Sequence, residues 1–423
     1  MSLPLLQKNE PLNVPQTLAQ AIALHQQGRL AEAAGLYSAI LAARPDHFDA
    51  LHMLGVIKLA QGQPQEALQL IAGAMGAKKP SPQILLNQGL ALSALQRHDE
   101  ALESFDQAIK RKAKFADAHV NRAAVLAILG RDEEALQSAR KAIAIAPNNA
   151  EAHYNLGNSL RRLGRNEEAL QSFERAIVLR PDYVNALNNR GMVLHQLRRF
   201  DEALASYERA LILRPLNPDA LNNVGSTLSE VRRFDEALKA FDAALALQPN
   251  EAEVLYNRGN ALKELGRLND ALASYDRALA VRPNLAEAFN NRGSVLHELT
   301  RFDEAIASFD RALALRPGYA EAINNRGNTL HELGRLDEAL ASFDQALALR
   351  PDFAEAHNNR GNTLQALNRP DEALAEFDRA IALRPGYAEA HHNRGTALGE
   401  LGRFDEANES FDRALSLQMD GER

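Results

Sequence analysis

Hydrophobic residues along the chain recur at spacings of three and four residues, in short segments separated by polar turns. The stretch from Asp182 to Pro215 shows this pattern twice, with a break near Arg198. Apolar positions at these spacings lie on one face of an α-helix. Each such stretch is therefore predicted to form two amphipathic helices joined by a tight turn, and the chain is predicted to be all-α.

The same stretch recurs with a period of 34 residues, marked by Pro147, Pro181, Pro215, Pro249, Pro283, Pro317, Pro351 and Pro385. With this proline as position 32, twelve units follow one another without insertion or deletion. A supersecondary unit repeated at a fixed period predicts an α-solenoid. We expect a leader or partial cap at 1–13, a single solenoid at 14–421 and a tail at 422–423. The predicted units are 14–47, 48–81, 82–115, 116–149, 150–183, 184–217, 218–251, 252–285, 286–319, 320–353, 354–387 and 388–421.

Four positions of the unit carry nearly the same residue throughout. Position 20 is alanine in all twelve units and position 27 in eleven, whereas position 24 is phenylalanine or tyrosine in ten and position 8 is glycine in ten. A glycine inside a helix costs about 1 kcal/mol relative to alanine, so a packing gain must offset it. We expect the second helix of each unit to approach this glycine closely, through the small alanines at positions 20 and 27.

Two further patterns predict helix ends. Glycine is frequent at position 15, as in Gly130 and Gly334, and glycine is the usual residue just after a helix C-terminus. A polar residue at position 33 is followed three residues later by an acidic one, as in Asp352 and Glu355 or Asn284 and Glu287. This spacing predicts a capping box at the start of the next unit.

Charged positions covary between neighbouring units. Position 7 is arginine in seven units, and position 25 of the preceding unit is acidic in all seven. Where position 25 becomes Arg140, the next position 7 becomes Leu156. We therefore expect an ion pair between consecutive units at each of seven arginines: Arg122, Arg190, Arg258, Arg292, Arg326, Arg360 and Arg394.

Composition narrows the function. The chain has no cysteine and a net charge of −7, which argues against thiol chemistry and against a general nucleic-acid binder. The longest apolar run, Ala123 to Leu129, is far shorter than the roughly 20 residues of a membrane span. We expect a cytoplasmic protein with neither nucleic acid nor a membrane among its partners.

One patch departs from the acidic average. It consists of Lys110, Arg111, Lys112 and Lys114, with Lys78 and Lys79 one unit earlier. Runs of this kind are usually solvated. An anionic partner is the alternative interpretation.

No catalytic motif is evident: the sequence lacks HExxH, a glycine-rich phosphate loop and GxSxG. His297 and His331 share position 12 with His195, but packed helices lie about 8–10 Å apart. That separation is too long for a shared zinc ion, whose bonds to nitrogen measure about 2.0–2.1 Å. We expect no enzyme activity, no cofactor, no catalytic residue and no metal site, and we expect the histidines at position 4 to be packing residues.

Asparagine forms the most regular polar pattern. It occupies position 6 in ten consecutive units and recurs at positions 5 and 9. Asparagine is a poor helix former, but its amide offers both donors and an acceptor, so a row of amides can hold the backbone of an extended peptide. A structural role for these residues is an equally weighted alternative. The candidate peptide-binding residues are Asn189, Asn223, Asn257, Asn291, Asn325, Asn359 and Asn393 at position 6, and Asn158, Asn260, Asn328 and Asn362 at position 9.

Glycine at position 8, alanine at 20 and 27, an aromatic residue at 24 and proline at 32, on a period of 34, resemble the tetratricopeptide repeat. The resemblance covers residues 14–421. It implies a right-handed superhelix whose first helices line a concave face that binds extended peptides or proteins. The usual aromatic residue at position 4 is here often leucine or histidine. The lysines and arginines of the family's carboxylate clamp are missing, so that mode is disfavoured.

The asparagine row also resembles the asparagine-lined superhelix of O-linked N-acetylglucosamine transferases, where it holds the polypeptide substrate. We therefore expect a non-enzymatic scaffold that binds a peptide or protein in its groove. The alternative is the substrate-recognition portion of such a glycosyltransferase system without its catalytic domain. An RNA-binding helical repeat is disfavoured by the uniform asparagines and the negative charge. The near-identity of the last units would permit self-association.

Overall fold

The computed structural model describes residues 12–421, and the regular structure in this range is α-helical throughout. The expected tail at 422–423 and all but the end of the expected leader lie outside the described residues. The chain divides into two compact parts, residues 1–215 and 216–423, and each is described by itself. The first contains α1 (Val14–Gln26), α2 (Leu30–Ala43), α3 (Phe48–Ala60), α4 (Pro64–Ala77), α5 (Pro82–Ala94), α6 (His98–Arg111), α7 (Ala116–Ile128), α8 (Asp132–Ile145), α9 (Ala150–Arg162), α10 (Asn166–Leu179), α11 (Val184–Gln196) and α12 (Phe200–Leu213). The second contains α13 (Pro218–Glu230), α14 (Phe234–Leu247), α15 (Ala252–Glu264), α16 (Leu268–Val281), α17 (Ala286–Glu298), α18 (Phe302–Leu315), α19 (Ala320–Glu332), α20 (Leu336–Leu349), α21 (Ala354–Ala366), α22 (Pro370–Leu383), α23 (Ala388–Glu400) and α24 (Phe404–Gly421).

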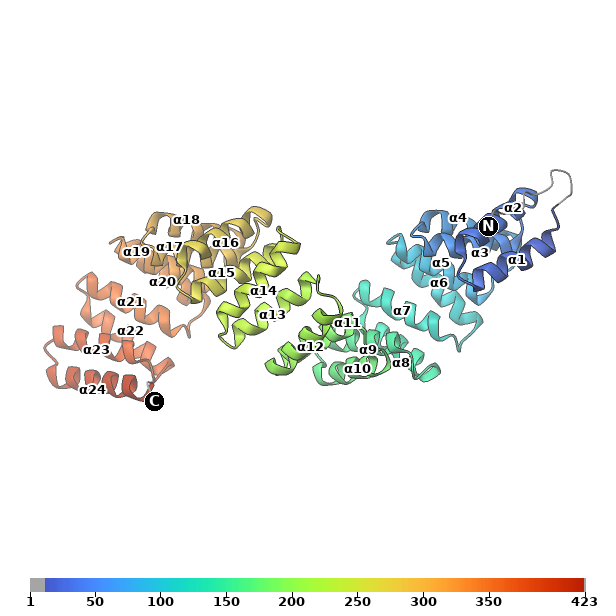
Figure 1. The fold of residues 1–423 in the computed structure, drawn as a ribbon. Helices are drawn as coiled ribbons and strands as arrows, with labels where there is room; N and C mark the ends of the chain where they lie inside the picture. The colour runs from blue at the N-terminus through green and yellow to red at the C-terminus, as the bar shows by residue number, and fades with distance from the viewer. Residues whose placement is uncertain (1–11, 422–423) are drawn as a thin grey trace. The chain divides into compact units, whose positions relative to one another are not determined.

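Each odd-numbered helix packs against the even-numbered helix that follows it, and within each of the two parts each pair packs on the next (Figure 1). The odd-numbered helices begin at position 1 of the 34-residue unit. From α3 onward, successive odd-numbered helices within each part also contact each other, whereas successive even-numbered helices within a part make no comparable contact among residues 12–421. Both parts are therefore helical-repeat solenoids whose odd-numbered helices form the closer-packed side.

The turn inside each pair has one backbone conformation. Position 15 has a positive φ in every unit, between 57° and 75°. Seven of these residues are glycine, as expected, and the others are Gln96, Arg198, Arg232, Thr300 and Asn368. The turn therefore keeps the left-handed backbone conformation even where position 15 is not glycine, although other residues adopt a positive φ less often.

The close approach of the second helix at position 8 is confirmed, and in nine of the ten glycine units the nearest atoms belong to the aromatic residue at position 24. An added Cβ at Gly327 would lie 2.7 Å from Cε1 of Phe343, the aromatic residue at position 24, and the same ring faces this glycine in most units. The alanines at positions 20 and 27, such as Ala339 and Ala346, are fully buried. One of them, Ala67, contributes its carbonyl oxygen, 3.2 Å from an added Cβ, to the surroundings of Gly55. Glycine is needed because atoms of an aromatic ring occupy the space that a Cβ would take.

The expected capping box is also wrong. Helices α17 and α21 begin one residue later than that motif requires, with Leu285 and Phe353 at the N-cap and no side-chain cap. The acidic residue at position 2 instead pairs with the arginine at position 31 of its own unit, as in Glu287 with Arg316. The hydrogen bond from Arg316 holds the pKa of Glu287 below its ordinary value.

The ion pairs between units are confirmed at all seven arginines. Their nitrogen-to-carboxylate distances are 2.6–3.1 Å. In six of the units the same guanidinium also donates to the serine at position 23 of its own unit, as Arg326 does to Ser342 at 3.0 Å. Each arginine therefore joins the preceding even-numbered helix to both helices of its own unit.

Candidate functional site

The asparagines at positions 6 and 9 lie on one face of the odd-numbered helices, since residues three apart share a face. Every candidate side chain is half-buried. The position-6 residues lie on α11 (Asn189), α13 (Asn223), α15 (Asn257), α17 (Asn291), α19 (Asn325), α21 (Asn359) and α23 (Asn393), and those at position 9 on α9 (Asn158), α15 (Asn260), α19 (Asn328) and α21 (Asn362).

Hydrogen bonds link the asparagines of consecutive units. Nδ2 of Asn325 donates to Oδ1 of Asn290, at position 5 of the preceding unit, over 3.1 Å. The same bond joins Asn359 to Asn324 at 3.1 Å and Asn257 to Asn222 at 3.2 Å. A further one joins Asn393 to Asn358 at 3.0 Å. These four position-6 side chains are therefore oriented by the unit before them.

A variant of the link occurs where position 5 is tyrosine. Nδ2 of Asn291 donates to Oη of Tyr256 at 3.1 Å and to Oδ1 of Asn260 at 2.9 Å. Asn189 makes the equivalent bonds to Tyr154 and to Asn158, at 3.3 and 2.7 Å. At these two places the structure brings candidate residues of positions 6 and 9 together.

The links leave hydrogen-bonding capacity on the same face. An amide nitrogen carries two N–H groups, and within residues 12–421 Asn325, Asn359 and Asn393 each use one of them. Asn328 and Asn362 make no hydrogen bond to any described residue. The asparagine row is thus partly structural, as the alternative interpretation predicted, and partly open.

Two hollows lie between successive odd-numbered helices at equivalent positions, two units apart. One of about 380 Å³ lies between α13 and α15, and one of about 170 Å³ lies between α17 and α19. Both are lined by positions 9, 12 and 13 of one unit and by positions 6 and 9 of the next. The shared lining is Ser226, Ser229, Glu230, Asn257 and Asn260 in the first and Ser294, His297, Glu298, Asn325 and Asn328 in the second.

His297 and His331, both at position 12, lie within hydrogen-bond distance of threonines of the next unit. Nδ1 of His297 lies 3.0 Å from Oγ1 of Thr329, and Nδ1 of His331 lies 3.0 Å from Oγ1 of Thr363. Among the described residues there is no group of three or more histidines, aspartates and glutamates that could hold a metal ion. These histidines therefore contribute polar edges to the asparagine face.

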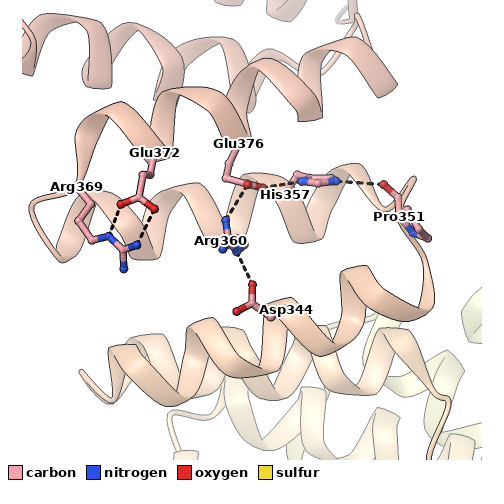
Figure 2. Close-up of polar contacts among 7 residues, drawn as sticks. All are labelled: Asp344, Pro351, His357, Arg360, Arg369, Glu372 and Glu376. Carbon is pink, nitrogen blue, oxygen red and sulfur yellow. Dashed lines mark hydrogen bonds and ion pairs between the residues drawn. The ribbon is translucent and has the colours of Figure 1, made fainter.

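The unit at residues 354–387 contains a polar network that the sequence did not reveal (Figure 2). Glu376 of α22 accepts from Arg360 Nη1 at 2.7 Å and lies 2.6 Å from His357 Nδ1. The other ring nitrogen of His357 lies 3.1 Å from the carbonyl oxygen of Pro351, and Arg360 Nε donates to Asp344 at 2.7 Å. The sequence feature that could have indicated this network is Glu376 at position 23. The other units with arginine at position 7 have serine there.

Helical pairs stacked on a constant period define a class of protein, the helical-repeat scaffold. The chain belongs to the tetratricopeptide repeat family. Family matches described as tetratricopeptide repeats cover residues 24–86, 86–150, 154–220, 216–284, 256–320, 308–341 and 352–420, and one described as a TPR repeat covers 327–368. No helix in the described range is long and apolar enough to cross a membrane.

Several solved structures are similar. The APC/C hetero-tetramer Cut9–Hcn1 shares 14% identity and a TM-score of 0.52, over 92% of this chain and 97% of that one, which supports the fold. YrrB, described as a TPR protein with an unusual peptide-binding site, shares 28% identity over 44% of this chain and 96% of its own, with a TM-score of 0.38. MamA shares 24% identity over 38% and 95%, with a TM-score of 0.35. No curated protein matches the chain in sequence.

Proposed function

We propose that the protein is a non-enzymatic scaffold that binds an extended peptide, or an extended segment of a protein, along the asparagine face of its odd-numbered helices. The observation that carries the proposal is the combination of oriented amides with hollows at equivalent positions of that face. Amides fixed by a neighbouring unit lose little conformational entropy when they bind a ligand, which favours affinity. The two hollows have the size of side-chain pockets.

The ligand is bound mainly through its backbone. An amide offers a donor and an acceptor, the two groups that each peptide unit also exposes, and the asparagines repeat with little variation from unit to unit. The hollows supply the part of the contact that depends on sequence. Their walls differ, since Ser229 lines one where His297 lines the other.

Replacing both Asn328 and Asn362 by alanine tests the proposal without removing a bond between units, because neither makes one in the described structure. Peptides are first selected from a random display library on the wild-type protein, and their affinities are then measured by fluorescence anisotropy. We expect the double variant to bind about tenfold more weakly, since each lost hydrogen bond is worth about 0.5–1.5 kcal/mol.

Gln345→Ala, on the exposed side of α20, is the matched control and is expected to bind normally. Circular dichroism must show equal helicity in all three proteins. Equal affinity of the double variant and the wild type would refute the proposed contact. The alternative function, substrate recognition for a glycosyltransferase, predicts in addition that the selected peptides contain serine or threonine.

A further inference from the structure

A hollow of about 180 Å³ lies on a different surface, between α6, α7 and α8, and no asparagine of the row lines it. Its walls include Asp106 of α6, His119 and Arg122 of α7, and Ser138 and Lys141 of α8. Arg122 donates to Asp106 at 2.6 Å and to Ser138 at 2.5 Å. The wall is therefore polar and holds two cations, Arg122 and Lys141, and two carboxylates, those of Asp106 and of Glu134, the latter 3.9 Å from Arg122.

His119 has an unsatisfied nitrogen in this wall. Its side chain is 4% exposed, and Nε2 lies 3.2 Å from the carbonyl oxygen of Ala113. Nδ1 is buried and has no hydrogen-bond partner. A buried polar atom without a partner costs about 1–3 kcal/mol, so this nitrogen marks a place where a partner is missing.

The chain itself shows which group fits there. His357 and Arg360 occupy the same positions of their unit as His119 and Arg122, and the carbonyl oxygen of Pro351 takes the place of that of Ala113 (Figure 2). In that unit Glu376 stands where Ser138 stands here. Its two carboxylate oxygens contact Arg360 Nη1 and His357 Nδ1, at 2.7 and 2.6 Å. The same histidine and arginine thus hold a carboxylate in one unit and face a hollow in the other.

The chain on both sides of Ala113, whose carbonyl oxygen faces His119, is basic. Lys110, Arg111, Lys112 and Lys114 lie at the end of α6 and in the loop around Ala113, and none of them forms an ion pair within the described residues. Residues 1–215 carry 25 lysines and arginines against 21 acidic residues, whereas residues 216–423 carry 23 against 34. The basic run that the sequence singled out therefore follows directly on Ile109, which lines the hollow, and flanks Ala113, whose carbonyl oxygen faces His119.

We propose that this hollow receives the carboxylate of an aspartate or glutamate from an acidic segment of a partner protein, held by His119 and Arg122. The flanking lysines and Arg111 attract the rest of that segment. The carboxylate would take the place that Glu376 takes in its own unit. The site is separate from the asparagine face, so it does not depend on the function proposed above.

Binding at this site should depend on pH. Because Nε2 faces a carbonyl oxygen, Nδ1 can donate to a carboxylate only in the doubly protonated ring. Burial lowers the pKa of His119, and Lys141 of α8 and Arg122 of α7 lower it further, against the hydrogen bond to Ala113 and the charge of Asp106 of α6. Glu134 of α8 completes the ionisable groups of the wall. The free ring is therefore neutral at neutral pH, binding takes up a proton, and affinity rises as the pH falls.

Ser138→Glu is the decisive variant, because it supplies the carboxylate from within the chain. The probe is a fluorescein-labelled peptide of alternating glutamate and serine, compared with its glutamine counterpart by fluorescence anisotropy. We expect Ser138→Glu to weaken binding of the glutamate peptide about tenfold or more and to raise Tm. The glutamine peptide should bind the wild type poorly, and the glutamate peptide should bind it more tightly at lower pH.

The matched control is Ser172→Glu, one unit further on, where His153 is present but Leu156 replaces the arginine. It adds the same charge and is expected to leave peptide affinity unchanged. His119→Phe keeps a ring of the kind that Phe289 provides at this position, and it should weaken binding and abolish its pH dependence. Unchanged binding by Ser138→Glu or His119→Phe would overturn the proposal. So would equal binding of the glutamine peptide, or full displacement of the glutamate peptide by orthophosphate.

Discussion

Replacing Gly327 by leucine will destabilise its unit by about 2 kcal/mol or more. Even the first added carbon would lie 2.7 Å from Cε1 and 2.9 Å from Cζ of Phe343, a fully buried ring. Overpacking of this kind costs about 1–3 kcal/mol and occasionally more, and leucine adds three more carbons. The higher helix propensity of leucine returns less than about 1 kcal/mol. The measurement is thermal unfolding followed by circular dichroism.

Gly318→Ala is the control, because no atom lies within 4 Å of the added carbon, and its Tm should stay close to that of the wild type. Each unit of a solenoid contacts mainly its neighbours, so the loss should be local. Hydrogen exchange is expected to quicken first in α19 and α20. An unchanged Tm for Gly327→Leu would contradict the packing of this ring on the glycine.

Removing the carboxylate of Glu376 will have the second largest effect. Glu376→Ala leaves His357 Nδ1 and Arg360 Nη1 without the oxygens that now lie 2.6 and 2.7 Å away. The three side chains are 13–22% exposed, and a hydrogen bond to a charged group contributes about 1.5–3 kcal/mol. We expect a loss of about 2 kcal/mol, measured by chemical denaturation, with faster hydrogen exchange in α21 and α22.

Glu372→Ala removes a carboxylate from the same helix, where it pairs with Arg369 at the surface (Figure 2). That pair is 44% and 55% exposed, and exposed ion pairs contribute little because water and salt screen them. Its unfolding curve should almost coincide with that of the wild type. Equal effects of the two alanine substitutions would show that the Glu376 network contributes no more than a surface pair.

Much of the fold could be predicted because each unit repeats the same pattern of apolar, small and charged positions. The 34-residue period predicted the helical pairs, and the residues at position 15 predicted the turn inside each pair. The covariation of Arg122 with Asp106, and of the equivalent residues, predicted the ion pairs between units. These features depend on spacing along one helix or on paired changes between units, and both are visible in a sequence.

The errors have a common cause. Which neighbour faces Gly327 depends on the rotation of the second helix, and this turns Phe343, rather than Ala339 or Ala346, toward the glycine. The capping box failed because its spacing was right but α21 begins after Phe353. A periodic pattern fixes which residues share a face, but not the rotation of one helix against another or the residue at which a helix starts.

The candidate site shows the same limit. The sequence located the asparagines on the first helix of each unit, but the bond from Asn325 to Asn290 spans 35 residues and two units. The presence of asparagine at both positions 5 and 6 did not indicate that position 6 of one unit would bond to position 5 of the unit before it. The pairing of His357 with Glu376 was hidden because it occurs where a single unit departs from the repeat.

The central claim is that a peptide binds on the odd-numbered helices. Photocrosslinking of a peptide selected from the display library tests this directly, with a photoreactive residue placed at Asn328 of α19 or at Gln345 of α20, and with mass spectrometry of the products. The account predicts efficient crosslinking from position 328 and almost none from position 345. Crosslinking from position 345 alone would place the ligand on the opposite side of the unit and would contradict the account.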